Sequence, residues 1–387
     1  MARLGDVCTR ITDGSHNPPS GVTHSEYLML SSKNVTDDAI TTENPRFLSK
    51  AEFESENRRT QVQHGDLLMT IVGTVGRVAV VPEELQGICL QRSVAVLKPK
   101  HELIAPRYLM YQLQSMQSFL EQEAHGVAQK GIYLKQVEQL DIRVLEMAEQ
   151  QKIVEHLDKV SALISLRKQQ IAKLDELVKA RFVEMFGDCK QNPKGWQTRH
   201  LEEIAEVGSS KRVFVEELQG SGIPFYRGTE VGALAEGKEI SPELFITEQH
   251  YTELCEATGA PQIGDLLMPS ICPDGRIWIV NTDEPFYFKD GRVLWVHAID
   301  RSYDPVFLLY TLKDRIMTDY SSIASGTTFA ELKIFALKQC CIFDVPLTLQ
   351  HQFAAFVAQT DQQKLTIQHS LAQLELLKKA LMQKHFG

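Results

Sequence analysis

Residues 151–186 read QKIVEHLDKVSALISLRKQQIAKLDELVKARFVEMF, a run that contains no glycine and no proline. A mostly apolar stripe follows it in steps that alternate between four and three residues: Ile153, Leu157, Val160, Ile164, Arg167, Ile171, Leu174, Val178, Arg181 and Met185. Such steps keep one face of a helix against a partner helix. The helix would extend for roughly 54 Å, which exceeds the needs of a compact domain. The run therefore predicts one half of a coiled coil that ends before Gly187.

The chain contains the same unit twice. GDLLM at residues 65–69 recurs at 264–268, and PRYLMY at 106–111 corresponds to PVFLLY at 305–310 with the same offset. Residues 352–386 again lack glycine and proline. They carry the stripe in Phe353, Val357, Ile367, Leu371, Leu374 and Leu381, with polar interruptions at Thr360, Lys364 and Lys378. A repeat of about 200 residues is far longer than a solenoid unit, so we infer a duplicated domain.

Each copy is expected to be a mixed α+β domain of many short strands, followed by a long helix. The expected division is a first domain at 1–148, a central helix at 149–187, a second domain at 188–348 and a C-terminal helix at 349–387. One shorter helix is expected at 106–121. Pairing the two long helices as an antiparallel coiled coil would bury both stripes and relate the domains by a pseudo-two-fold axis. The alternative is that each helix packs only on its own domain.

Composition limits the compartment and the class of protein. With 387 residues, 43% hydrophobic and 24% charged, the chain has the make-up of two or three globular domains. We expect a cytoplasmic protein without a signal peptide or membrane span, because no run reaches 18 apolar residues. Seven cysteines without a Cys-x-x-Cys pair favour buried thiols over a metal site. A net charge of −9 means that DNA binding would require a local basic face.

Three catalytic motifs are only partly present. Asn17-Pro18-Pro19 lacks the aromatic fourth residue with which adenine methyltransferases stack a flipped base. GALAEGKE at 232–239 lacks the Ser or Thr that holds magnesium in a phosphate-binding loop. Glu331 and Lys333 would need the distant Asp274 to form a nuclease cluster. The sequence therefore predicts no catalytic residue and no metal ligand.

One family fits the whole chain. The unit Gly-Asp-(Leu/Ile)-Leu-x7-Gly-Arg-apolar precedes a proline-led aromatic helix, a strand and EQQKIV at 149–154, where the long helix opens. This order, present twice, resembles the specificity subunit of type I restriction-modification systems. The second copy keeps Val345-Pro346-Leu347 and Gln352 but has FAA at 353–355 in place of KIV.

The resemblance implies a function for each part. Each globular part would be a target recognition domain that reads one half of a bipartite, gapped sequence in double-stranded DNA. The helices would set the spacing and dock two methyltransferase subunits, which restriction subunits then join. The chain would be non-catalytic and bind no cofactor, while S-adenosylmethionine, ATP and Mg would belong to the partner subunits. Two readers at fixed separation suit DNA, whose major-groove sites on one face recur about every 34–36 Å.

Polar and basic residues in the loops of the repeat are the candidate DNA contacts. They are Lys33, Asn34, Arg77 and Arg92 in the first copy and Lys211, Arg212, Arg227 and Arg276 in the second. Arg and Lys contact phosphates or guanine edges, and Asn pairs with adenine. The equivalent places of Arg77 and Arg276 favour phosphate contact, because the two halves should read different bases. The alternative for each residue is a solvated charge or a salt bridge, and Ser15, His16 and Asn17 are alternative base readers.

Two other classes of protein stay open on the sequence. One is a coiled-coil scaffold that does not touch DNA, and the other is a stand-alone DNA-modifying enzyme. Sequence-selective, salt-dependent binding would exclude the scaffold. Turnover by the chain alone would indicate the enzyme.

Overall fold

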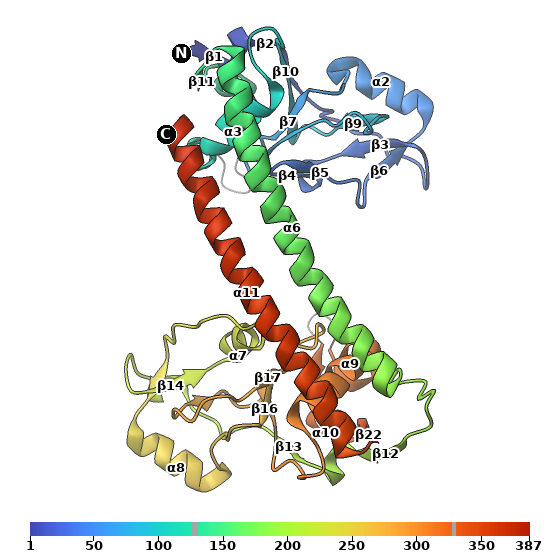
Figure 1. The fold of residues 1–387 in the computed structure, drawn as a ribbon, viewed down its shortest axis with the longest axis vertical. Helices are drawn as coiled ribbons and strands as arrows, with labels where there is room; N and C mark the ends of the chain where they lie inside the picture. Colours follow the sequence, from blue (N-terminus) through green and yellow to red (C-terminus); the bar gives the residue numbers. More distant parts are fainter. Residues whose placement is uncertain (125–130, 327–329) are drawn as a thin grey trace. The chain divides into compact units, whose positions relative to one another are not determined.

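The computed structural model describes residues 1–124, 131–326 and 330–387. The chain forms two compact units, Met1–Gln169 together with Gln368–Gly387, and Gln170–Ile367. Both long helices, α6 (Met147–Phe186) and α11 (Leu347–Phe386), contribute residues to both units. Each unit therefore includes its own part of each long helix (Figure 1).

The first unit contains two main sheets. The larger has the order β2-β10-β7-β8 and is antiparallel throughout, with strands Cys8–Asp13, Val94–Pro99, Leu67–Thr70 and Val78–Val80. The smaller has the order β6-β3-β9, with strands Arg46–Leu48, Tyr27–Leu30 and Ile88–Leu90. Its central strand β3 is antiparallel to β6 and parallel to β9.

Short elements complete the first unit. Two pairs of two-residue strands are β1 (Ala2–Arg3) with β11 (Asp141–Ile142), and β4 (Val35–Thr36) with β5 (Ala39–Ile40). The short helices are α1 (Leu4–Val7), the 3-10 turn η1 (Ser32–Asn34), α2 (Lys50–Thr60), α3 (Pro106–Ser115), α4 (Gln117–Glu123) and α5 (Leu134–Glu138). The single helix expected at 106–121 is wrong, because the backbone leaves the helical path at Met116 (φ −91°, ψ 3°).

The second unit repeats this topology. Its larger sheet has the order β13-β19-β16-β17, with strands Glu206–Gly208, Val293–His297, Leu266–Pro269 and Trp278–Ile279. Its smaller sheet has the order β15-β14-β18, with strands Phe245–Ile246, Ile223–Tyr226 and Tyr287–Phe288, and β14 is again antiparallel to one neighbour and parallel to the other. The same strand order and the same pairing senses confirm the duplication.

The remaining elements of the second unit are short, apart from one helix of intermediate length. The paired strands are β12 (Gln197–His200) with β22 (Cys341–Asp344), and β20 (Ala324–Ser325) with β21 (Glu331–Leu332). The helices and turns are η2 (Leu201–Glu203), η3 (Val215–Glu217), α7 (Gly228–Ala235), α8 (Glu248–Thr258), α9 (Pro305–Ile323) and α10 (Ile334–Lys338). Of these, α7 takes the place after the central strand that η1 and the β4–β5 hairpin occupy in the first unit.

The repeated Gly-Asp motif has a structural role. The side chain of Asp66 accepts a hydrogen bond from the backbone N–H of Gln63 at 2.8 Å, and Asp265 accepts the same bond from Gln262 at 2.8 Å. Each buried carboxylate thereby closes the turn that leads into a core strand. The glycine of the Gly-Arg motif is also structural, since Gly76 and Gly275 have φ of 90° and 65°, which disfavours any side chain.

The long helices bury the stripe that the sequence shows. All ten positions of the stripe in α6 are buried or half-buried, whereas Leu163, Leu166 and Leu177 outside it are 43%, 48% and 49% exposed. Thr360, Lys364 and Lys378 also lie on the less exposed face of α11. The helix α6 begins two residues before the expected start at 149 and ends at Phe186, one residue before the expected end at 187.

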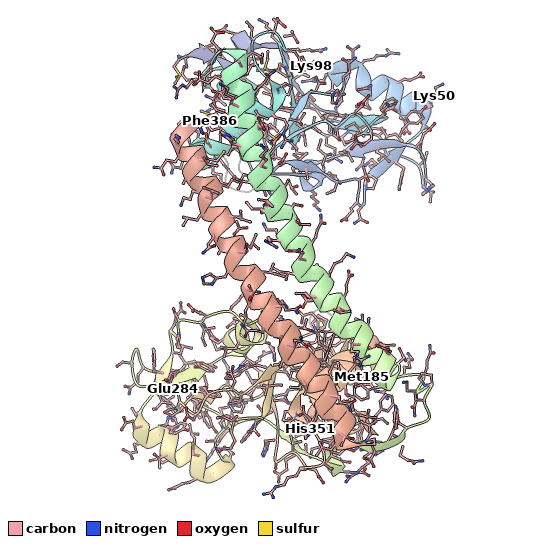
Figure 2. All side chains as sticks on the ribbon, in the orientation of Figure 1. Lys50, Lys98, Met185, Glu284, His351 and Phe386 are labelled. Atoms are coloured by element: carbon pink, nitrogen blue, oxygen red, sulfur yellow. The ribbon has the colours of Figure 1, made fainter. Side chains whose placement is uncertain are left out.

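The core of each unit takes residues from both long helices. In the first unit, Ile153 and Leu157 of α6 belong to the same cluster on which Leu381 and Phe386 of α11 pack. Phe386, labelled near the end of α11 in Figure 2, lies 5.3 Å from the ring of Tyr108. In the second unit the shared core instead holds the end of α6 and the start of α11, including Val178, Phe182, Phe186, Phe353 and Val357. Ion pairs also join the helices, Lys168 with Glu375 at 3.1 Å in the first unit and Lys364 with Asp175 at 2.6 Å in the second.

A buried glutamine joins each long helix to its domain. The amide of Gln150 donates to the carbonyls of Leu103 and Leu145, both at 2.8–2.9 Å, and accepts from Ala105 N–H at 2.9 Å. Gln350 makes the equivalent bonds to Ser302, Val345 and Asp304, and both glutamines are 0% exposed. The comparison of the two copies in the sequence assigned Gln352 to the helix opening. This assignment is wrong, because Gln350 makes the bonds that Gln150 makes in the first copy.

In the part of the chain that the structure describes, no helix is both long enough and apolar enough to cross a membrane. The cysteines carry free thiols, and five of the seven are buried.

Candidate nucleic-acid interface

The parallel strands β3 and β9 end side by side at one corner of the first domain. Carboxyl ends of adjacent parallel strands diverge into loops and commonly form ligand sites. Here β3 continues into Ser31, Ser32 and Lys33, while β9 continues into Gln91 and Arg92. Two of the basic residues proposed from the sequence, Lys33 and Arg92, therefore lie at one corner although 59 positions separate them in the chain.

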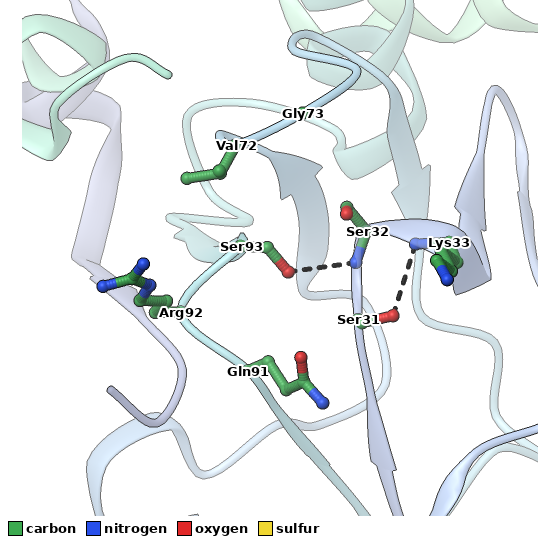
Figure 3. A pocket seen from close by; sticks show the side chains of 8 residues that line it. All are labelled: Ser31, Ser32, Lys33, Val72, Gly73, Gln91, Arg92 and Ser93. Atoms are coloured by element: carbon green, nitrogen blue, oxygen red, sulfur yellow. Dashed lines mark hydrogen bonds between the residues drawn. The ribbon is translucent and has the colours of Figure 1, made fainter. Parts of the chain in front are cut away.

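A pocket of about 240 Å³ occupies this corner. Figure 3 shows Lys33 and Arg92 on opposite sides of it. Between them, the hydroxyl of Ser93 accepts a hydrogen bond from the Ser32 N–H at 3.1 Å, which joins the two strand ends. The lining residues are Ser31, Ser32, Lys33, Val72, Gly73, Gln91, Arg92 and Ser93.

The polar loop after β2 joins the same corner. Ser15 N–H donates to the Leu90 carbonyl at 2.7 Å, and Arg92 N–H donates to the Ser15 carbonyl at 2.8 Å. Gly14 makes this approach possible, because a Cβ there would lie 2.1 Å from the Leu90 oxygen. Next to it, His16 contacts the Asp13 carboxylate at 2.8 Å. Ser15, one of the alternative base readers, thus lies beside Arg92.

The four first-copy candidates differ in their availability. Lys33 and Arg92 are exposed and Arg77 is half-buried. Arg77 lies near Asp37, whose pKa is raised by burial and lowered in part by the charge of Arg77. Asn34 is 4% exposed, and its amide donates to the Glu43 carbonyl at 2.9 Å and accepts from Ser31 N–H at 3.0 Å. Asn34 therefore holds the η1 turn, and its amide is not free to pair with a base.

The second-copy candidates are more strongly paired with acids. Arg227 donates to Glu230 at 2.6 Å and lies 3.6 Å from Glu243. Burial by itself would raise the pKa of Glu230, but the hydrogen bonds from Arg227 and Thr229 outweigh it and lower that pKa to about 2. A carboxylate bound this tightly neutralises the guanidinium.

The other three second-copy candidates form a graded series. Arg276 pairs with Asp274 at 2.8 Å and approaches Glu236 at 3.7 Å. Arg212 is 69% exposed at its side chain and pairs with Asp290 at 3.1 Å. Lys211 is exposed, and its side chain has no acidic partner in the described residues. Of the four candidates in this copy, Lys211 and Arg212 therefore leave the most positive charge available to a ligand.

The sequence reasoning missed several residues at these corners. Gln91 and Ser93 line the first pocket, and Lys289 directly follows β18, where Gln91 follows β9. The sequence gives only a weak indication of these residues, which is that each comes shortly after a short apolar strand. The P-loop-like stretch is excluded by geometry, because Gly232 lies inside helix α7 and not in a loop. Within residues 1–124, 131–326 and 330–387, no cluster of three or more His, Cys, Asp or Glu could hold a metal ion.

Comparison with known proteins gives one consistent family. The model of the type I restriction modification DNA specificity domain matches this chain twice, at residues 23–176 and 193–376. The specificity subunit of the type I restriction enzyme EcoBI of Escherichia coli is 29% identical over 158 residues, which is 39% of this chain and 33% of that subunit. The chain thus spans about a third of that relative.

A second relative aligns along almost the whole chain. The specificity subunit of the type I restriction enzyme MjaIX of Methanocaldococcus jannaschii is 23% identical over 392 residues, covering 95% of this chain and 84% of that subunit. Among solved structures, the S subunit of a type I restriction-modification system from M. genitalium has a similar fold. Its TM-score is 0.55 at 14% identity, over 100% of this chain and 95% of that one.

Proposed function

This chain belongs to the family of type I restriction modification DNA specificity domains, and we therefore propose that it selects the DNA sequence for a type I restriction-modification complex. Each of its two domains would read one half of a bipartite, gapped target in double-stranded DNA. The observation that carries this proposal is the repeated corner at the carboxyl ends of the parallel strand pairs β3–β9 and β14–β18.

The corners support reading of different half-sites. The two domains share strand order, but the chain that leaves the central strand is a 3-10 turn and hairpin in one and helix α7 in the other. A common scaffold with different local backbone presents different side chains to DNA. Lys33, Arg77 and Arg92 in the first domain, and Lys211 and Arg212 in the second, are the best candidates for phosphate and base contact.

We also propose that α6 and α11 form one antiparallel coiled coil that separates the readers and relates them by a pseudo-two-fold axis. In support, the start of α6 packs with the end of α11 in one unit, and the end of α6 packs with the start of α11 in the other. The repeat would then comprise domains at 1–148 and 188–348 and helices at 149–187 and 349–387. Exposed leucines on these helices offer apolar area for two methyltransferase subunits, to which restriction subunits would bind.

The chain would have no catalytic role of its own. S-adenosylmethionine, ATP and Mg would bind to the partner subunits, and the complex would act in the cytoplasm. The physical argument is that this chain supplies placement, while the methyl transfer and cleavage chemistry needs cofactor sites for which its own motifs are incomplete.

The test combines genome mapping with binding. The chain is produced with the methyltransferase subunits of its own host, and methylated adenines in the host genome are mapped with and without its gene. A gapped motif that disappears with the gene supports the proposal. The assembled complex should then bind that motif with a steep dependence on salt and reject a duplex in which either half is scrambled.

Other outcomes identify the rival functions. Assembly without any preference for DNA sequence would indicate a scaffold. Modification of DNA by the chain alone would indicate an enzyme. Either result would overturn the proposal.

A further inference from the structure

In the first unit, Arg107 of α3 joins three parts of the fold. Its guanidinium donates two parallel hydrogen bonds to Asp38, at 3.0 and 3.1 Å, and one from Nε to Asp158 of α6 at 2.8 Å. Tyr111, one turn along α3, donates to the same Asp158 oxygen at 2.6 Å and accepts from Arg107 at 3.1 Å. Domain and long helix thus share one network of hydrogen bonds.

This network is partly shielded from water and contains strong interactions. The side chains of Arg107 and Asp38 are only 37% and 23% exposed. A planar guanidinium that bridges two carboxylates is held in orientation as well as in place. Lys378 of α11 lies 5.6 Å from the centre of the Tyr111 ring, so the second long helix also contacts this network.

The network is connected to the corner at the carboxyl ends of β3 and β9, which carries Lys33 and Arg92. Asp38 forms the turn of the β4–β5 hairpin with φ of 67°, and its N–H donates to the Val78 carbonyl at 3.1 Å. The hairpin follows η1, which carries Lys33, and Thr41 N–H donates back to the Asn34 carbonyl at 2.8 Å. Arg107 therefore contacts α6 through Asp158. Through Asp38 it also contacts the hairpin that follows the turn with Lys33.

The second unit attaches its domain differently. Val306 occupies the position of Arg107, and Tyr310 that of Tyr111. The ring of Tyr310 packs against Phe353 at 5.2 Å and Phe182 at 6.4 Å. In the second unit an aromatic cluster occupies the place of the Arg107 network. The directional hydrogen bonds to the long helix are therefore a property of the first domain.

We propose that Arg107 is a positioning residue, which holds the corner with Lys33 and Arg92 at one orientation to α6 and so makes the complex strict about the length of the gap in its target. This inference rests on the proposed function. One base pair added to the gap moves a half-site by roughly 3.4 Å and turns it by roughly 35°. A first domain that is held rigidly on α6 cannot follow that change. A loosely attached domain can move to bind the shifted half-site.

The test measures methyl transfer by the complete complex to duplexes that carry the mapped motif with its own gap, or with a gap one base pair longer or shorter. We expect the unaltered complex to prefer its own gap by roughly a hundredfold, the scale on which small misplacement costs rate. Arg107→Met should reduce this preference to roughly tenfold, because the stem remains but the fork is lost. Arg107→Lys should lie between, since an ammonium cannot supply the same planar fork.

The matched control is Lys159→Ala on α6. It removes an exposed ion pair with Glu155 of the same helix α6 (2.6 Å) and should leave the gap preference unchanged. If Arg107→Met does not assemble, Tyr111→Phe tests the same network by removing one hydroxyl. A variant that transfers methyl groups more slowly to every duplex, with its gap preference intact, shows a merely structural role and overturns the inference. An unaltered complex without any gapped motif contradicts the proposed function instead.

Discussion

At the scale of single residues, each domain depends on one buried glutamine whose amide oxygen and N–H groups are hydrogen-bonded. Gln150 and Gln350 each tie the first turn of a long helix to the loop before a shorter helix by two hydrogen bonds, and a third bond goes to the carbonyl two residues before the long helix. Removing such a side chain leaves buried donors and acceptors without partners, which costs more than the net value of the bonds.

Gln150→Ala should therefore lower the free energy of unfolding by about 3 kcal/mol. Its neighbour Gln151 is exposed, so Gln151→Ala should change that energy by less than about 0.5 kcal/mol. Urea unfolding followed by circular dichroism checks both values. Equal effects for the two variants would contradict the role assigned to the buried amide.

Lys378 is a charge in the stripe of α11. Burial lowers the pKa of its ammonium below 10.5, and this effect outweighs the attraction of the facing carboxylates; the charged groups around it are Asp37, Asp38, Arg107 and Lys168. A lysine whose folded pKa is lowered destabilises the fold while it is protonated. That penalty is complete at neutral pH and disappears as pH rises towards the unfolded value near 10.5.

Lys378→Met should therefore raise the melting temperature at pH 7, and the difference from the unaltered chain should shrink as the pH rises towards about 10.5. Thermal scans at a series of pH values give the comparison. A lower melting temperature for the variant at neutral pH would show that the pairing with Asp37 and the Tyr111 ring dominates instead.

At the scale of elements, the long helices have one face that is buried or half-buried along their length. Ile171 lies on that face and is half-buried, whereas Leu177 on the same helix and in the same unit is 49% exposed. The two positions offer the same chemical substitution in two environments.

Ile171→Glu should destabilise the chain by roughly 2 kcal/mol, because it loses apolar burial and places a charge against the partner helix. Leu177→Glu should cost less than about 0.5 kcal/mol in the isolated chain. Calorimetry of the two variants is the measurement. An unchanged melting temperature for Ile171→Glu would argue against the buried stripe.

At the scale of the whole molecule, a net charge of −9 must coexist with the DNA binding proposed above. Acidic neighbours remove two candidate contacts from the available positive charge, since Glu230, Glu243 and Asp274 pair with Arg227 and Arg276. Among the candidate DNA contacts, the basic groups without such strong pairing lie in two places, one in each domain. Loss of either place should affect one half of the target.

Lys33→Ala with Arg92→Ala should relax selection at one half-site, and Lys211→Ala with Arg212→Ala at the other. Each lost phosphate contact should also reduce the slope of log affinity against log salt by about 0.9. Lys50→Ala, on the exposed helix α2, is the control and should alter neither quantity. Methylation mapping reads the half-sites, and a double variant that relaxes both halves equally would contradict the assignment.

Local pattern determined the duplication, the two long helices and their buried faces, because periodicity and the spacing of glycine and proline act between near neighbours in the chain. The candidate DNA contacts of both copies could also be chosen from the sequence, because they lie in polar loops that follow apolar strands. Only the tertiary structure decided that each domain core takes one end of both helices, and that Ser15, Lys33 and Arg92 meet at one corner. It also decided that Asn34 is buried and that Arg227 and Arg276 are neutralised. These outcomes depend on contacts between residues far apart in the chain, which no local pattern encodes.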